Sequence, residues 1–149
     1  MLSVHESLDL SALIAAVGDA VIVADGAGNI ILWNAAAERL FGYSEQEALG
    51  QSLDLIIPER LRKRHGEGYE HTMSTGVTKY GTTLLKVPAV TKDGTSLSIA
   101  FTVAMLNGPD GKPTAIAAVI RDETARFTED RALRKRLAEA EAELAALKL

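Results

Sequence analysis

The stretch RLRKRHGEGYEH, residues 60–71, holds two of the three histidines in the 149-residue chain. An imidazole can ligate a metal ion, so these histidines are the first candidates for chemistry. Gly66 and Gly68 interrupt an otherwise helical pattern, and a glycine inside a helix costs about 1 kcal/mol relative to alanine. Two explanations are open. Either the stretch forms a loosely wound surface helix, or a flat group approaches the backbone beside His65.

Helical spacing defines the surroundings of His65, because residues three or four positions apart share one face of a helix. His65 therefore lies on a stripe of apolar or small residues: Leu61, Gly68, Tyr69 and Met73. This stripe would form an apolar lining with one glycine gap for a planar group. His71 lies six residues further along, about 240° round the helix, and is expected to be solvated.

The composition excludes several classes of protein. The chain has no cysteine, which rules out disulfides, thiolate metal sites and cysteine nucleophiles. Its net charge is −4 and its charges are intermixed, so no nucleic-acid partner is expected. No apolar run approaches about 18 residues and no signal peptide is visible, which predicts a cytoplasmic protein without a membrane partner. We expect no enzyme activity, because no catalytic triad order, metal cluster or phosphate loop is present.

The first half of the chain predicts a hairpin followed by helices. AVIVADGAGNIILWN contains two β-rich runs joined by DGAGN, and Asn34 at its end is expected to cap the next helix. Ser44 and Glu47 have the spacing of a capping box. Pro58 marks the start of a further helix, which carries the histidine stretch as far as Gly76.

Three more strands are predicted in the second half. TTLLKVPAVTKDGTSLSIAFTVAM indicates two strands around a KDG turn, and TAIAAVIRD indicates a last strand. In the second of these three strands, bulky apolar residues alternate with small ones: Leu97, Ile99, Phe101, Val103 and Met105. This alternation is typical of a half-buried antiparallel strand. The order of elements predicts the α+β class, with a five-stranded antiparallel sheet and helices on one face.

Helices are expected at both ends of the chain. We divide it into an amphipathic N-terminal cap helix (residues 1–18), a central domain (19–124) and a C-terminal helix (125–149). The last helix has apolar residues at the 4-3-4-3 spacing of a coiled coil: Leu133, Leu137, Ala140, Leu144 and Leu147. It either folds back on its own domain or pairs with a second copy. Because it continues directly from the last strand, we prefer a homodimer formed through the terminal helices.

Several motifs occur in order along residues 10–125. They are the hairpin, WNAAAERLFGYS, LGQSLDLIIPE, the strand KDGTSLSIAFTV and the closing AAVIRDET. Together they resemble the PAS sensory domain of the S-box type. The resemblance implies a five-stranded sheet cupped around a small-molecule pocket, in a domain used for sensing, partner binding and dimerisation. The light-sensing LOV branch needs a cysteine, so it is not expected here.

The segment LIIPERLRKRHGEGYEHTMSTG resembles the helix of haem-binding PAS sensors, in which the axial histidine follows a Pro-x-x-x-Arg segment. His65 falls on that ligand, so the resemblance implies haem b with His65 on the iron. The residues expected to line the cofactor pocket are His65, Tyr69, Met73, Leu85, Leu97, Ile99, Phe101, Val103, Ile116 and Ala118. Oxygen-sensing members carry an arginine where this chain has Leu85, so CO or NO is expected rather than oxygen.

Three functions stay open at this point. The first is a haem-based gas or redox sensor that signals through the C-terminal helix to a partner, such as a separate kinase or response regulator. The second is a cofactor-free PAS module for dimerisation or docking. The third is a flavin-binding redox sensor. The sequence contains no kinase, cyclase or DNA-binding domain, so the output is expected to pass through a partner. Whether His71 is a second ligand also stays open.

Overall fold

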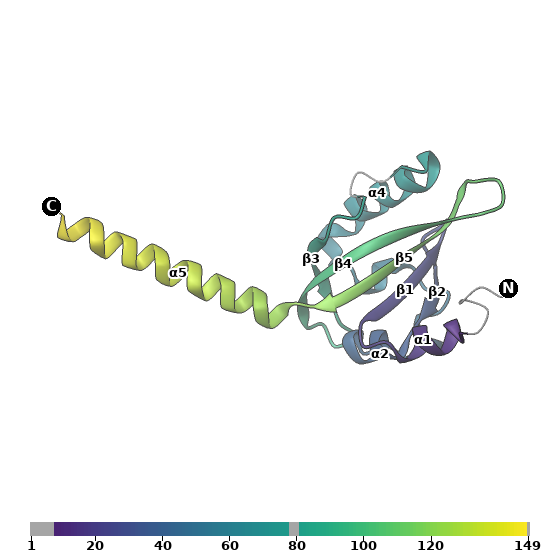
Figure 1. Cartoon of the computed structure of the whole chain (residues 1–149), viewed down its shortest axis with the longest axis horizontal. Helices are drawn as coiled ribbons and strands as arrows, with labels where there is room; N and C mark the ends of the chain where they lie inside the picture. The colour runs from purple at the N-terminus through teal and green to yellow at the C-terminus, as the bar shows by residue number, and fades with distance from the viewer. Residues whose placement is uncertain (1–7, 78–80, 149) are drawn as a thin grey trace.

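The computed structural model describes residues 8–77 and 81–148 (Figure 1). The strands are β1 (Ala20–Asp25), β2 (Ile30–Trp33), β3 (Leu85–Val90), β4 (Ser96–Asn107) and β5 (Pro113–Asp122). The helices are α1 (Leu10–Ala16), α2 (Ala35–Phe41), α3 (Glu45–Ala48), α4 (Arg62–Thr75) and α5 (Thr124–Leu147), with the 3₁₀ turns η2 (Leu53–Ile56) and η3 (Glu59–Leu61). Residues 1–7 of the predicted cap helix and residue 149 of the predicted C-terminal helix lie outside the described residues.

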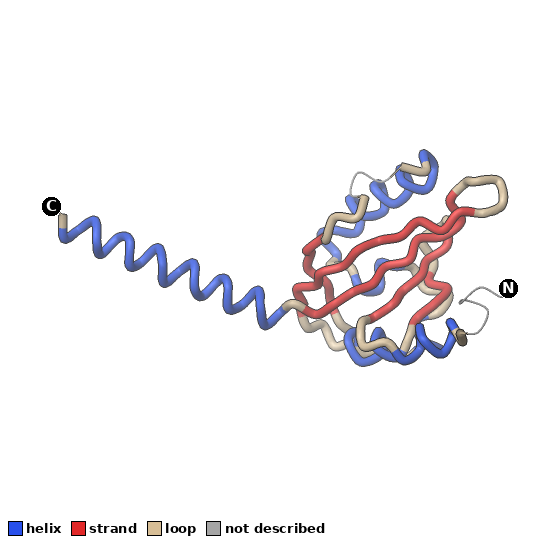
Figure 2. Tube along the Cα trace, in the orientation of Figure 1, coloured by secondary structure: helices blue, strands red, loops and turns tan. Residues whose placement is uncertain are grey.

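The five strands form one antiparallel sheet in the order β2-β1-β5-β4-β3. Helices α2, α3 and α4 lie in the chain between β2 and β3 (Figure 2). Because β2 and β3 are the two edge strands, this connection has to cross the whole width of the sheet. The predicted α+β class, the antiparallel five-stranded sheet and the helices on one face are confirmed.

The buried core lies between one face of the sheet and helices α2 and α3. Ile22 and Ile120 on this face pack with Trp33 and Phe41, and each of the four is at most 4 % exposed. The indole N–H of Trp33 donates to the carbonyl of Tyr43 at 3.0 Å, so the ring is buried without an unpaired donor. We call the face that carries Ile22 and Ile120 the inner face of the sheet.

Asn34 is the one buried polar side chain among the described residues, at 5 % exposure. Its Oδ1 accepts hydrogen bonds from the backbone N–H groups of Ala37, at 3.0 Å, and Val21, at 2.9 Å. Its Nδ2 donates to the carbonyls of Ile14 and Asp19 at 2.9 and 3.1 Å. One amide therefore joins α1, β1 and α2, and the predicted capping role is confirmed.

The helix boundaries follow the sequence signals with one difference. Ser44 and Glu47 form the predicted capping box on α3. Helix α4 ends at Gly76, whose φ of +70° is the left-handed conformation that favours glycine. Pro58 precedes η3, however, and the α-helix begins only at Arg62. No side chain caps either start, and a tighter 3₁₀ turn is one way to pair the free backbone groups there.

The two terminal helices differ in how they meet the domain. Ile14 of α1 and Val17, which follows the helix, are half-buried, while Leu10 and Leu13 are 50 % and 57 % exposed. Helix α5 leaves the end of β5 and projects away from the domain (Figure 1), so the alternative in which it folds back is wrong. No helix within residues 8–77 or 81–148 combines the length and the apolar character that a membrane span requires.

Replacing Asn34 with Ala should lower the free energy of unfolding by about 2 kcal/mol, because buried backbone groups lose their partner. The matched control is Ser44→Ala, which removes an exposed cap and should cost about 1 kcal/mol. Urea unfolding followed by circular dichroism measures both changes. If Asn34→Ala cost less than Ser44→Ala, the central role of this amide would be contradicted.

Candidate functional site

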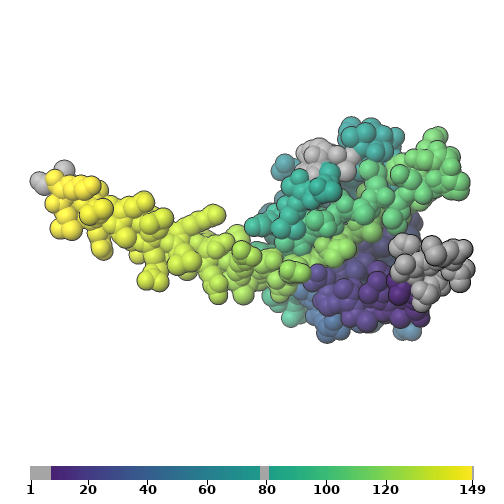
Figure 3. All heavy atoms as spheres, viewed as in Figure 1, coloured from purple at the N-terminus to yellow at the C-terminus, as the bar shows by residue number. Residues whose placement is uncertain are grey.

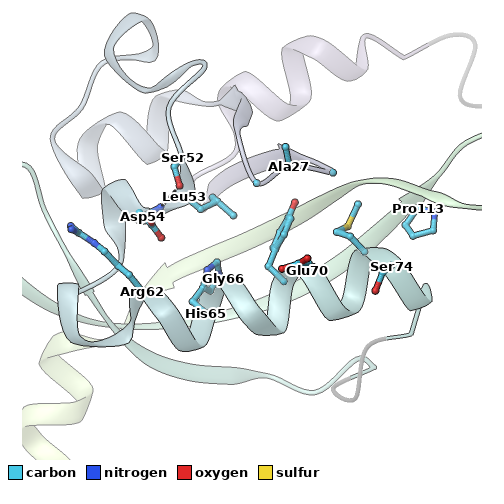
Figure 4. A pocket seen from close by; sticks show the side chains of 14 residues that line it. Ala27, Ser52, Leu53, Asp54, Arg62, His65, Gly66, Glu70, Ser74 and Pro113 are labelled. Carbon is cyan, nitrogen blue, oxygen red and sulfur yellow. Dashed lines mark hydrogen bonds between the residues drawn. The ribbon is translucent and has the colours of Figure 1, made fainter.

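A cavity of about 640 Å³ lies between α4 and the turn that joins β1 to β2 (Figure 4). Its lining residues come from four segments: Gly26, Ala27, Gly28; Ser52, Leu53, Asp54; Arg62, His65, Gly66, Tyr69, Glu70, Met73, Ser74; and Pro113. Those on α4 recur at helical spacing, so the cavity runs along one face of that helix. The segment that leads into η2 lies at one end of the cavity and the first residue of β5 at the other (Figure 4).

Helix α4 is held loosely because its sequence offers few apolar side chains to bury, and none of its residues is buried. Gly66 lies in the cavity wall, whereas Gly68, the predicted gap, is not a lining residue. A Cβ added to either glycine would meet no atom within 4 Å, so packing within the chain requires neither of them. At Gly66 the backbone therefore faces open space that a flat group can reach.

Tyr69 fastens α4 to the β1–β2 turn. Its hydroxyl donates a hydrogen bond of 2.5 Å to the Asp25 carbonyl. Burial, together with the Asp25 carboxylate, raises the pKa of Tyr69 to about 12, so the hydroxyl keeps its proton at neutral pH. A Cβ on Gly28 would lie 3.8 Å from the Tyr69 ring, and the φ of +85° there favours glycine. The Asp25 carboxylate holds the turn by accepting from the backbone N–H groups of Ala27 and Asn29.

His65 lines the cavity one helical turn before Tyr69, with 6.0 Å between the ring centroids. His65 is an exposed residue, and only the part of it that faces the cavity wall is shielded from water. This desolvation lowers the pKa of His65 below its usual value, and the negative charge of Asp54 opposes the shift. The imidazole is therefore neutral at pH 7 and keeps a nitrogen lone pair for a metal. Within residues 8–77 and 81–148, no three His, Asp or Glu side chains form a metal-binding group.

The other residues singled out on α4 lie on different sides of the helix. Met73 lines the cavity, and its methyl group would lie 3.6 Å from a Cβ on Gly26. His71 is exposed and is not a lining residue. Its carbonyl accepts hydrogen bonds from the hydroxyls of Ser74 and Thr75. The cavity thus includes the predicted residues His65, Tyr69 and Met73.

The seven predicted sheet residues do not line this cavity. They are Leu85, Leu97, Ile99, Phe101, Val103, Ile116 and Ala118. Paired residues of antiparallel strands project to the same face, which places these side chains on the inner face. Val103 pairs with Ala118, which pairs with Ile22 of the core. Phe101 likewise pairs with Ile120. The predicted pocket therefore consists of two surfaces, one on α4 and one on the sheet.

The inner face is covered unevenly. Four of the seven sheet residues belong to the buried core or pack against it: Leu97, Ile99, Phe101 and Ala118. The other three, Leu85, Val103 and Ile116, are half-buried and lie outside that cluster. We call these three residues the half-buried apolar surface. Ile116 follows Pro113 of the cavity wall by three residues on β5, so this surface begins close to the cavity.

The site prediction omits much of the cavity wall: the β1–β2 turn, residues 52–54 and Arg62. The β1–β2 turn and residues 52–54 meet only in the folded chain, where the N–H of Leu53 donates a hydrogen bond to the Gly28 carbonyl at 3.0 Å. Arg62 donates from Nε to the carbonyl of Ile57 at 3.0 Å. Its spacing of three residues before His65 was the one sequence signal for its place on this face.

Comparison with known proteins identifies the family. A family model described as PAS fold matches residues 8–122. The sensor protein FixL of Bradyrhizobium diazoefficiens is 33% identical over 138 residues, which cover 91% of this chain and 26% of FixL. The oxygen sensor protein DosP of Escherichia coli is 27% identical over 100 residues, which cover 67% of this chain and 12% of DosP.

A solved structure agrees with the observed architecture. The crystal structure of the PAS domain of a protein from Colwellia psychrerythraea matches with a TM-score of 0.68 at 23% identity, covering 78% of this chain and 95% of that one. The chain spans about a quarter of FixL and about an eighth of DosP. The family match includes all five strands and helices α1 to α4. PAS domains are generally sensory rather than catalytic, and this chain belongs to the PAS family as a sensing domain.

Proposed function

We propose that this PAS domain is a haem-based gas or redox sensor in which His65 is the axial ligand of the iron. The observation that carries the proposal is a neutral imidazole in the wall of a cavity, close to an apolar surface that the chain leaves half-covered. A haem b brings its own ring nitrogen donors, so a single protein imidazole is enough to hold its iron.

The chemistry of the surrounding residues fits a haem b. The macrocycle is flat and largely apolar, and the half-buried apolar surface with Met73 offers it hydrocarbon contacts. Gly66 leaves the helix backbone accessible beside His65. Arg62, on the same wall, offers a cationic partner for the two carboxylates of the group.

The relatives support a cofactor rather than an empty domain. FixL is named as a sensor protein and DosP as an oxygen sensor protein. Protein side chains do not bind dioxygen reversibly, so a gas-sensing domain needs a metal or redox group. The likeness of residues 55–76 to the helix of haem-binding PAS sensors favours haem over flavin for this chain.

A bound haem would supply an iron that responds to a diatomic gas or to a change of redox state. The residues of the inner face would surround the gas with hydrocarbon, because Leu85 offers no hydrogen-bond donor and Ala118 is small. Selection would then rest on size and apolarity rather than on hydrogen bonding, which favours CO or NO over oxygen.

The output would pass along β5 into α5. Ile116 and Ala118 belong to this strand, which leads directly into the helix. Thr124 fixes the junction, because its Oγ1 accepts from the Ser98 N–H at 3.0 Å and donates to the Asp122 carboxylate at 2.6 Å. We propose that α1 and α5 form a homodimer that passes the signal to a separate kinase or response regulator.

When purified wild-type protein is titrated with haem, we expect the Soret band to shift within about 400–430 nm. Replacing His65 with Ala should abolish this shift, because the iron loses its axial ligand. His71→Ala is the matched control and should keep the shift. Equal loss in both variants would indicate two-histidine ligation. If the wild-type protein gave no Soret shift, the haem proposal would fail. Flavin absorption in the purified protein would then favour a flavin sensor, and no cofactor absorption would favour a cofactor-free docking module.

The pKa of His65 should lie below the usual value of about 6.5 and should fall further in Asp54→Asn, because the opposing negative charge is lost. NMR titration of the ring protons measures it, and Glu67→Gln is the control. As the pH is lowered, His65 gains a proton in the unfolded chain before it does in the folded protein. His65 therefore makes the free energy of unfolding decrease as the pH drops below about 6.5. His65→Gln should flatten that fall. A higher His65 pKa in Asp54→Asn would refute the assigned electrostatics.

Removing residues 125–149 should weaken the dimer at least about tenfold, because the apolar positions of α5 lose their partner. Sedimentation equilibrium of the full and the truncated chain measures the change. Absorption after haem loading serves as the control, since the truncation leaves His65 and the sheet in place. A full chain that stayed monomeric at about 100 μM would contradict the homodimer.

A further inference from the structure

Helix α5 carries an apolar seam that the described chain leaves exposed. The seam consists of Leu133, Leu137, Ala140, Leu144 and Leu147. Its leucines are at least 54 % exposed, and the helix stands clear of the domain in the space-filling view (Figure 3). A helix of 24 residues with such a seam gains free energy only if a second apolar face covers it.

The charged residues beside the seam follow a regular order. We assign Leu137 and Leu144 to the a positions of a heptad and Leu133 and Leu147 to the d positions. With this assignment, all of the flanking e and g residues except one are charged. The charged flanking residues are Glu129, Arg134, Arg136, Glu141, Glu143 and Lys148. Along the helix their charges run negative, positive, positive, negative, negative, positive. None of these residues forms an ion pair within residues 8–77 and 81–148.

These signs match a parallel partner of the same sequence. In a parallel pair, each g residue faces the e residue five positions later in the other helix. Glu129 then faces Arg134 of the second copy, Arg136 faces Glu141, and Glu143 faces Lys148. All three contacts join opposite charges, and each occurs twice in a symmetric dimer.

An antiparallel pair uses the charges less completely. There Arg134 would face Glu141 and Arg136 would face Glu143, but Lys148 would face the uncharged Phe127. The two domains would also sit at opposite ends of helices that are about 36 Å long, so their α1 helices could not pair. The parallel arrangement places both domains at one end.

The first part of α5 shows where such a pairing begins. Arg126 and Asp130 occupy the d and a positions before Leu133. In a parallel dimer the two Asp130 carboxylates would repel each other, so the seam closes only from Leu133 onward. The segment between Thr124 and Leu133 therefore lies between the domain and the closed part of the pair.

We infer that residues 133–147 of α5 are a self-recognition surface that binds α5 of a second copy in parallel and in register. The inference rests on the homodimer proposed above and adds its orientation, its register and the charged contacts that select it. The second copy is the occupant that the order of charges favours, because each flanking charge meets its opposite.

Charge exchange in the full chain tests the orientation. Arg136→Glu should weaken the dimer about tenfold in sedimentation equilibrium, because two attractive contacts become repulsive. The double variant Arg136→Glu/Glu141→Arg should restore wild-type affinity, since this contact exists only in the parallel pair. Arg136→Glu/Glu143→Arg should be weaker still. Restoration by the second double variant and not by the first would overturn the inference in favour of an antiparallel pair.

A cysteine crosslink provides a second readout that does not depend on charge. The chain has no cysteine of its own, so Leu147→Cys introduces a single thiol. Mild oxidation should give a covalent dimer, because residue 147 meets itself at a d position of a parallel pair. The control Lys135→Cys, on the outer side of the helix, should crosslink far less. Equal crosslinking of both variants, or none at residue 147, would refute the register.

The outcomes separate this inference from the proposals on which it rests. A monomeric wild-type chain would refute the homodimer itself. A dimeric wild type with no rescue by Glu141→Arg and no crosslink at residue 147 would refute only the parallel register. Haem binding, read from the absorption of the same samples, would be unaffected by these α5 changes and tests the sensor proposal independently.

Discussion

The hydrogen bonds of the buried Asn34 amide determine how α1, β1 and α2 meet. A buried amide costs free energy unless its donors and acceptors are paired, and Asn34 forms four hydrogen bonds with three elements. These bonds fix the start of α2, which brings Phe41 against Trp33, with ring centroids 5.6 Å apart. Because α2 and α3 then cover the part of the inner face near β1, the part near β3 and β4 is left to α4.

Helix α4 cannot cover its part of the sheet in the same way. Its sequence is rich in charged residues and glycine, so it buries no side chain, and it is attached to the β1–β2 turn through Tyr69. The sheet below is apolar, and Leu85, Val103 and Ile116 stay half-buried. This mismatch between an apolar sheet and a polar helix leaves space for a ligand, whereas the packed side near β1 provides the stability.

Strand β5 connects the candidate site with the terminal helices. It pairs with both β1 and β4 at the centre of the sheet, so a displacement of β5 involves most of the sheet. At its end, Arg121 forms an exposed ion pair of 3.1 Å with Asp19, in the link between α1 and β1. An exposed pair adds little stability, but it ties the link that follows α1 to the end of β5, from which α5 starts. Both helices proposed for the dimer therefore meet the domain next to one strand.

The sequence by itself determined the five strands, the α+β class, the capping residues and the place of His65 beside Tyr69 and Met73. Those features depend on local periodicity, turn chemistry and spacing along one helix, which a single chain displays directly. Only the tertiary structure decided that residues 52–54 and the β1–β2 turn close the cavity, and that the seven predicted sheet residues do not line it. The tertiary structure also decided that α5 points away from the domain. Long-range hydrogen bonds, such as Leu53 to Gly28, and the incomplete packing of α4 depend on residues distant in sequence, and periodicity carries no information about them.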